Sequence, residues 1–177
     1  SVDFHPTRSK LLTAGLDGSV KIWDFDVEKA HTALLDDSDT LADIVNFASV
    51  LRTEEERMPN VARWGPAGNL IIAAYVSGDL MVWKPATTVE QYDKTDERSF
   101  NKEHWAIHKV MKLPTEASDV NFSACGRYVI SSCQGGSVFV HSAVTGEVNQ
   151  QLTPDDAHAH SAQHAAFDPL MKLASTF

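Results

Sequence analysis

The side chains most able to do chemistry in this chain are three histidines near its carboxyl end. His158, His160 and His164 follow Asp155 and Asp156 in the run DDAHAHSAQH. Imidazole and carboxylate groups are common zinc ligands, so this run could belong to a metal-dependent enzyme. In an extended segment, however, His164 lies about 13 Å beyond His160, at roughly 3.3 Å per residue. The spacing therefore favours a structural role, with a metal site and a pH-sensitive contact as the alternatives.

Other catalytic arrangements are weaker. Ser131 and Ser132 lie in a strand-like run without the sharp strand-to-helix turn that exposes a nucleophilic serine. Gly135 and Gly136 are not followed by the helix that a phosphate-binding loop requires. No pair of carboxylates stands out from the ordinary surface acids. We therefore expect neither catalysis nor a cofactor.

The elements that carry these residues are copies of one unit. It appears at 11–25 (LLTAGLDGSVKIWDF), 70–85 (LIIAAYVSGDLMVWKP) and 128–143 (YVISSCQGGSVFVHSA). Each copy has an apolar run, a glycine-bearing turn and a second run that alternates with a period of two, which is the pattern of a half-buried hairpin. A unit that cannot bury its own apolar faces must stack against its copies. The sequence therefore predicts an all-β array.

Equivalent aromatic residues end a short strand ahead of each unit, and a fourth one marks the start of a fourth copy: Phe4, Trp64, Phe122 and Phe167. The last step between them is 45 residues, which matches the WD-repeat period of about 40 to 45. The two earlier steps are 60 and 58 residues. The first two units therefore carry insertions, at about 24–43 and 85–102.

These positions predict one partial β-propeller domain over 1–177, with repeat units at about 1–59, 60–117, 118–157 and 158–177. A blade needs a fourth, outer strand. The apolar runs at 44–52 and 105–113 are available to supply it, with 36–40 as the tip of the first insertion. Propellers close with 4 to 8 complete blades, so we expect this chain to be a fragment of a larger ring.

Composition points to a water-soluble protein. Hydrophobic residues make up 43% of the chain, and the longest apolar run is about seven residues, far short of a membrane span. No positively charged, apolar leader is visible. Cys125 and Cys133 have no metal-like spacing, so we expect two reduced, packed thiols in a cytosolic or nuclear protein.

Negative charge is concentrated around the first insertion. The net charge is −9, and residues 24–59 hold ten acidic residues against three basic ones, whereas 84–117 hold six of each. Such a surface repels phosphate and attracts basic partners. It is either a solvated loop or an electrostatic contact for a basic chain. The candidate protein-binding residues, which include a second acidic site near the carboxyl end, are Asp36, Asp37, Asp39, Glu54, Glu55, Glu56, Asp155 and Asp156.

The first unit resembles a WD repeat. Thr13, Asp17 and Trp23 match three members of the hydrogen-bonded network of such repeats, and His158 falls where the structural histidine precedes a first strand. The segments 60–68, 80–84, 101–105 (NKEHW) and 163–170 are similar in order and spacing to the WD-repeat middle subunit family of chromatin assembly factor. The HIR-type histone regulators are the next most similar family, with a weaker match at NKEHW.

Two repeats depart from this pattern. The second has Ala73 and Ser77 where the network has Ser or Thr and Asp, and the third has Gly135 and His141 in place of Asp and Trp. We therefore expect blades two and three to depend on packing rather than on the network.

The resemblance implies a WD-repeat β-propeller of seven blades, of which this chain holds three and the start of a fourth. It implies a non-catalytic, nuclear scaffold in chromatin assembly that works with a larger subunit and with histones H3 and H4, without membrane or sequence-specific nucleic-acid binding. The alternatives are an HIR-type chaperone and a generic WD-repeat adaptor, such as a ubiquitin ligase substrate receptor.

Overall fold

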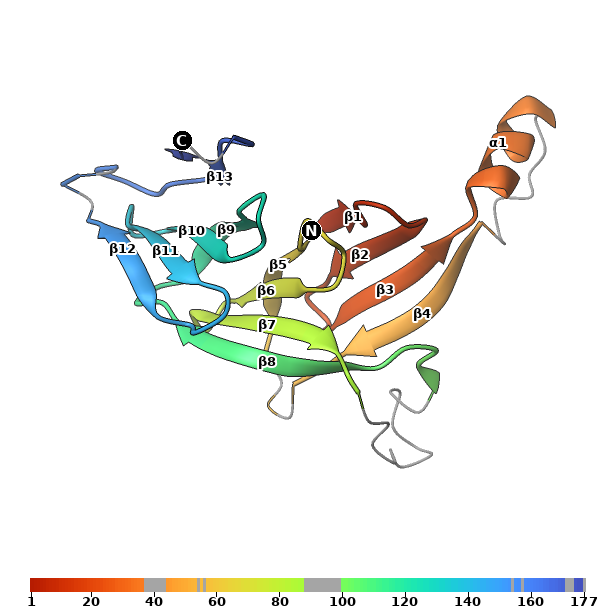
Figure 1. Cartoon of the computed structure of the whole chain (residues 1–177), viewed down its shortest axis with the longest axis horizontal. Coiled ribbons are helices and arrows are strands. Elements are labelled where there is room, and N and C mark those ends of the chain that lie inside the picture. The colour runs from red at the N-terminus through yellow and green to blue at the C-terminus, as the bar shows by residue number, and fades with distance from the viewer. Residues whose placement is uncertain are drawn as a thin grey trace.

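The computed structural model describes residues 1–36, 44–53, 55, 57–87, 100–153, 155–156, 158–170 and 174–176. Within them, the strands form three four-stranded antiparallel sheets and a two-stranded one (Figure 1). The first sheet is β1 (Val2–Phe4), β2 (Lys10–Ala14), β3 (Val20–Phe25) and β4 (Val45–Leu51), and the second is β5 (Pro59–Trp64), β6 (Ile71–Tyr75), β7 (Asp79–Pro85) and β8 (Trp105–Lys112). The third is β9 (Ala117–Phe122), β10 (Tyr128–Cys133), β11 (Val138–Ser142) and β12 (Val148–Leu152), followed by β13 (Ala165–Phe167) and β14 (Ala174–Thr176).

Each four-stranded sheet is one blade. Its strands are in chain order, from the inner strands β1, β5 and β9 to the outer strands β4, β8 and β12. The predicted hairpins form the two middle strands of blades one to three, and the predicted outer strands at 44–52 and 105–113 are β4 and β8. β13 and β14 begin blade four. The prediction of a partial all-β propeller is therefore confirmed.

The three hairpin turns each contain a glycine with positive φ, as the sequence predicts: Gly18, Gly78 and Gly136. Gly136 is needed for a second reason. A Cβ atom at this position would lie 2.2 Å from the carbonyl oxygen of His158. The turn of blade three therefore packs directly under the segment that leads into blade four.

The core lies between the blades rather than within one of them. Leu12, Val20 and Ile22 on one face of blade one share a cluster with Ile71 and Trp83 of blade two. The opposite face of blade two packs against blade three, and blade three packs against β13 in the same way. A single blade could not bury both of its faces, so stacking is what stabilises the sheet.

Blade one also has an open face. The register pairs Phe4 with Leu11 and Leu11 with Trp23, so these three side chains share that face. The equivalent residues of blade two, including Trp64, are buried against blade one, whereas Phe4 is 68% exposed. In blade two, this face is covered by blade one. In blade one, the equivalent face has no neighbouring blade among the described residues.

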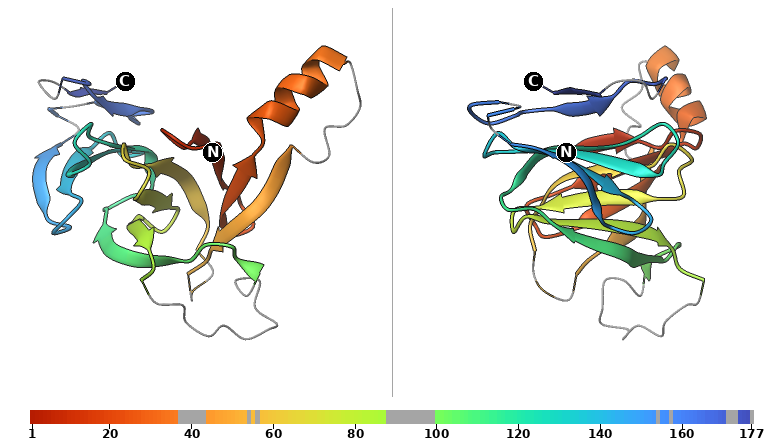
Figure 2. Two further views of the ribbon diagram at one scale, coloured as in Figure 1. Left: turned by 45° about the vertical axis from the view of Figure 1, so that its right-hand side comes forward. Right: turned by 60° about the vertical axis from the view of Figure 1, so that its left-hand side comes forward.

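The first insertion contains a helix that the sequence analysis missed. α1 (Val27–Asp36) follows β3 and projects away from the sheets (Figures 1 and 2). Asp26 caps it, because its carboxylate accepts a hydrogen bond from the backbone N–H of Lys29 at 3.0 Å. Of the predicted tip at 36–40, Asp36 is the last residue of α1 and 37–40 lie outside the described residues.

Both cysteines are free thiols, but only Cys133 is packed. The prediction of two packed thiols is wrong for Cys125, which is exposed in the turn between β9 and β10. Hydrogen bonds from Ser123 and from Arg127 lower the pKa of the Cys125 thiol to about 7. Among the described residues, no helix has both the length and the apolar character to cross a membrane.

Candidate interaction surfaces and the repeat network

Two of the predicted acidic residues, Asp36 and Glu55, lie toward opposite ends of β4. The end of the blades at which β3 stops and α1 (Val27–Asp36) begins is called the helix side. The opposite end, which carries the hairpin turns at Gly18, Gly78 and Gly136, is called the turn side. Asp36 ends α1 on the helix side, whereas Glu55 follows β4 on the turn side. Among the predicted acids that the structure describes, Asp36 and Glu55 therefore do not share one surface.

On the helix side, charge is uneven along α1. Glu28 lies in the first turn, where a negative charge interacts favourably with the helix dipole. The last turn contains no basic residue and ends in Asp36. The sequence continues with Asp37 and Asp39, which lie outside the described residues. The carboxyl end of the helix thus has no basic residue of its own in its last turn to offset the negative dipole end.

On the turn side, Glu55 is exposed but already paired. Its carboxylate accepts hydrogen bonds from Arg57 at 3.1 and 2.6 Å. Glu54 and Glu56 lie outside the described residues. Asp155 and Asp156 are exposed in the turn that follows β12, and the Asp156 carboxylate accepts a hydrogen bond from the Thr153 hydroxyl at 2.9 Å.

The best-built polar cluster on the turn side centres on Asp79, which the sequence analysis missed. Its carboxylate is buried and accepts hydrogen bonds from Lys112 at 2.7 Å, from Ser77 at 2.6 Å and from Arg57. Burial alone would raise the pKa of Asp79. The hydrogen bonds from Lys112 and Ser77 and the charge of Arg57 outweigh burial and hold it below its usual value. The signal was present in the sequence, because Ser77, Gly78 and Asp79 form the glycine-bearing turn of the second unit.

The proposed WD-repeat network of blade one forms only in part. The Trp23 indole N–H donates to the Thr13 hydroxyl at 2.9 Å. Among the described contacts, the Asp17 carboxylate makes no hydrogen bond to Thr13 or Trp23. Its carboxylate instead accepts from the Ser19 hydroxyl and from Lys21, both at 2.7 Å, and these contacts hold its pKa well below its usual range.

The structure separates the histidines of the candidate metal site. The His158 ring lies 2.7 Å from the Thr176 hydroxyl. Thr176 pairs with Ala165 as Thr13 pairs with Val2, so His158 contacts the blade-four equivalent of Thr13. His164 instead lies 3.5 Å from Asp119, in blade three. No group of three metal-binding side chains occurs in the part of the chain that the structure describes.

Blade three has the polar residues of the network without its hydrogen bond. By register, Ser131 and His141 are equivalent to Thr13 and Trp23. Both side chains are fully buried, and among the described residues neither has a hydrogen-bond partner. Burial lowers the pKa of His141, so the ring is held neutral. This agrees with the expectation that blade three depends on packing.

The NKEHW segment at 101–105 has a clear structural role. The Asn101 side chain accepts from the Val50 backbone N–H at 2.9 Å and donates to the Val50 carbonyl at 3.1 Å. The Lys102 N–H donates to the Ala48 carbonyl at 2.8 Å. These bonds close the outer edge of β4, which would otherwise present unpaired backbone groups. We call residues 101–104 the strap, because they tie the second insertion to blade one.

Ion pairs reinforce the strap. Lys102 lies 3.4 Å from Asp24 at the end of β3. Glu103 lies 3.4 Å from Lys10 of β2, and Lys10 also pairs with Asp24 at 2.7 Å. The most distinctive sequence segment of the chain therefore joins blades one and two.

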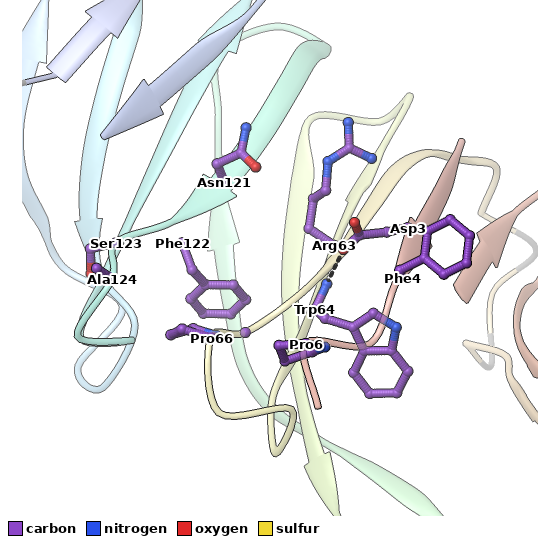
Figure 3. Close-up of a pocket in the computed structure, with 11 residues that line it drawn as sticks. Asp3, Phe4, Pro6, Arg63, Trp64, Pro66, Asn121, Phe122, Ser123 and Ala124 are labelled. Carbon is purple, nitrogen blue, oxygen red and sulfur yellow. Dashed lines mark hydrogen bonds between the residues drawn. The ribbon is translucent and has the colours of Figure 1, made fainter. Parts of the chain in front are cut away.

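A pocket of about 270 Å³ opens where the inner strands β1, β5 and β9 end (Figure 3). The equivalent positions Asp3, Arg63 and Asn121 line it. Asp3 accepts from the Trp64 backbone N–H at 2.7 Å, and Asn121 donates to the Ala165 carbonyl at 2.7 Å. Arg63 pairs with Asp119 of blade three at 3.2 Å. These side chains are engaged in joining each inner strand to the next blade.

Comparison with known proteins agrees with this architecture. The model of the WD domain, G-beta repeat, matches residues 1–24. The chain is 28% identical to the chromatin assembly factor 1 subunit FAS2 homolog of Oryza sativa subsp. japonica, over 96% of this chain and 29% of that protein. It is also 28% identical to a chromatin assembly factor 1 subunit of Schizosaccharomyces pombe, over 92% of this chain and 30% of that protein. Protein HIR1 of Candida albicans is 23% identical over 99% of this chain and 21% of its own length.

The chain spans about 30% of the length of the chromatin assembly relatives that it matches. The match covers nearly the whole chain. The predicted order of resemblance, with HIR-type proteins behind the chromatin assembly factor subunits, is confirmed, since those subunits are 23 to 28% identical to this chain and HIR1 is 23% identical. The chain is therefore a divergent partial WD-repeat propeller similar to these chromatin assembly factor 1 subunits.

Proposed function

We propose that this chain belongs to a non-catalytic WD-repeat scaffold subunit of a histone chaperone complex that assembles chromatin. The observation that carries the proposal is similarity to chromatin assembly factor 1 subunits over 96% and 92% of the chain. The strap adds support, because the segment on which the resemblance to this family most depends has a defined place in the fold. A fold alone would not suffice, since propellers host many functions.

The proposed partners are a larger subunit of the same complex and histones H3 and H4, and the proposed location is the nucleus. Neither membrane binding nor sequence-specific DNA binding is part of the proposal. The net charge of −9 supports it, because an acidic chain repels DNA phosphates and attracts basic histones.

Purification of the tagged protein from nuclear extract tests the proposal. Recovery of a larger chromatin assembly subunit together with H3 and H4 is the expected result. Recovery of a ubiquitin ligase scaffold instead would favour the generic adaptor and overturn the proposal. Metal analysis of the same preparation tests the third alternative, an enzyme built on the histidine cluster, against which the separation of His158 from His164 counts.

The second candidate function is that of an HIR-type histone chaperone, which the match to HIR1 over 99% of the chain favours. Its lower identity, 23% against 28%, places it second. Co-purification with subunits of an HIR-type complex, and not with a larger chromatin assembly factor subunit, would reverse this order.

The acidic residues are proposed as the contact with the histones, and their separation makes the proposal testable one side at a time. A helix-side variant carries Asp36, Asp37 and Asp39 changed to Lys. A turn-side variant carries the same change at Glu54, Glu55 and Glu56. Charge substitutions in insertions and loops usually change stability little, so we expect both variants to fold. The side that contacts histones should show weaker binding, with the larger loss at low salt, where screening is weakest.

A pull-down with purified H3–H4 at two ionic strengths gives the result, with thermal unfolding of each variant as the control for folding. Loss in only one variant assigns the contact to that side of the blades. Unchanged binding in both would make the acidic residues solvated surface and leave the histone assignment dependent on resemblance alone.

A further inference from the structure

His5 makes an unusually complete set of contacts for a side chain in a turn. It lies between β1 and β2 and is 7% exposed. Its Nδ1 atom accepts hydrogen bonds from the backbone N–H groups of Thr7, at 3.1 Å, and Arg8, at 3.0 Å. Its Nε2 atom lies 3.2 Å from the Gly68 carbonyl oxygen. Because Nδ1 accepts two bonds, the ring proton must be on Nε2, which then donates to Gly68.

These contacts join two blades. His5 belongs to blade one, whereas Gly68 lies in the turn between β5 and β6 of blade two. The His5 ring packs edge-on against Trp64, with 4.6 Å between ring centroids. Gly68 has a φ of +69°, and a Cβ atom there would lie 2.2 Å from the ring, so only glycine leaves room for the imidazole.

The charged groups around the ring oppose a second proton on balance. Burial acts most strongly and lowers the pKa of His5, and the positive charges of Arg8 and Lys10 act in the same direction. The Gly68 carbonyl and the charge of Glu103 act against them. Glu103 lies 3.4 Å from Lys10, which offsets its charge.

We propose that His5 is a pH-sensitive latch that holds the β1–β2 turn of blade one against the β5–β6 turn of blade two while its ring is neutral. Protonation at Nδ1 would point an N–H group at two backbone N–H donors and leave both without an acceptor. The protonated ring must then leave its site, and the contact with Gly68 opens. The latch contributes stability above the ordinary pKa of histidine, and this contribution is lost as the pH falls below it.

The variant His5→Asn tests the latch. An Asn side-chain oxygen can accept hydrogen bonds from the same two backbone N–H groups, as in an Asx turn, and it does not titrate in this range. His31→Asn, on the exposed face of α1, is the matched control. Amide exchange at Thr7 and Arg8 is measured in the whole protein at about pH 7.5 and about pH 5.5, on either side of the unperturbed histidine pKa, and corrected for intrinsic exchange.

We expect the wild type and His31→Asn to lose protection at these two amides several-fold at the lower pH, and His5→Asn to keep the same protection at both values. Gly68→Ala should remove the protection at both values. Equal wild-type protection at the two pH values would overturn the proposal, and so would an undiminished pH effect in His5→Asn. If His5→Asn does not fold, the wild-type exchange and the NMR titration of the His5 ring decide the question.

Discussion

The hairpin turns of blades one and two contain the same three residue types, Asp, Gly and Ser, in opposite order. Blade one has Asp17-Gly18-Ser19, and blade two has Ser77-Gly78-Asp79. In both, the serine hydroxyl donates to the carboxylate across a glycine with positive φ, at 2.7 Å in blade one and 2.6 Å in blade two.

The order decides where the carboxylate lies. The Asp17 side chain precedes the glycine, is 49% exposed and pairs with Lys21. Asp79 is the first residue of β7, and its side chain is 5% exposed and forms ion pairs with Arg57 and Lys112. Blade two thus lacks the Thr13–Trp23 hydrogen bond at its Ala73 position but has a buried ionic cluster that blade one does not. A repeat that loses its consensus residues can replace one polar anchor with another.

The largest expected effect is that of Asp79→Ala. Removing the buried carboxylate removes the acceptor of the Ser77 hydroxyl and the ion pairs with Arg57 and Lys112, and should cost about 2 to 3 kcal/mol of unfolding free energy. Asp17→Ala removes an exposed pair and should cost less than about 1 kcal/mol. Urea denaturation of both variants measures the difference. Equal losses would show that the two turns are not anchored as the structure has them. Asp79→Asn, which keeps hydrogen-bonding atoms without the charge, should fall between the wild type and Asp79→Ala.

The next effect concerns the strap, which stabilises blade one from outside. Asn101→Ala leaves the Val50 N–H and carbonyl without partners at a partly buried edge and should cost about 1 to 2 kcal/mol. Gln150→Ala, on the exposed outer strand of blade three, is the control and should be close to neutral. Thermal unfolding of the two variants compares them. A neutral Asn101→Ala would mean that water replaces the strap without loss.

A smaller effect should separate blade one from blade three. Thr13→Val removes the acceptor of the Trp23 N–H and should cost about 1 kcal/mol. Ser131→Ala, at the equivalent position, removes a buried hydroxyl that has no partner among the described residues. It should be neutral or slightly stabilising, because burying an unpaired hydroxyl is unfavourable. Chemical denaturation of both variants at neutral pH measures the difference. A clear loss in Ser131→Ala would show that a polar network operates in blade three as well.

The smallest effect at neutral pH, and the most specific, is that of His141→Phe. Burial lowers the pKa of His141, so the unfolded chain takes up a proton more readily than the folded one. The wild type should therefore lose stability as the pH falls below the ordinary histidine value, and His141→Phe should lose less. Urea midpoints measured between about pH 7.5 and about pH 5.5 test this, since the unperturbed histidine pKa lies between them. Identical pH profiles would show that His141 does not contribute.

Local patterns were sufficient to predict the blades. Alternation in 11–25, 70–85 and 128–143, with glycine at the turns, is a property of neighbouring residues, and the hairpins formed as predicted. The outer strands could be predicted from the need for a fourth strand. α1 was missed, although the Asp26 cap and the helix-forming residues that follow it are visible in the sequence, because it lies in an insertion and the prediction was based on the pattern of the repeats.

The candidate site was less predictable. The sequence placed the candidate acidic residues around the first insertion and near the carboxyl end, but only the direction of β4 shows that Asp36 and Glu55 lie toward opposite ends of it. Asp17 was expected to join Thr13 and Trp23, and the structure gives it to Ser19 and Lys21 instead. A hydrogen bond depends on side-chain direction and burial, which repeat spacing does not report.

Residue order and spacing alone were enough to establish the blade pattern, the two insertions and the family resemblance. The roles of the distinctive residues, in contrast, became visible only in three dimensions. Asn101 pairs with the backbone of Val50, 51 positions earlier, and His5 reaches Gly68, 63 positions later. Such contacts form because stacked blades bring distant turns and edges together, and the unpaired backbone groups at those edges must find partners wherever the fold supplies them.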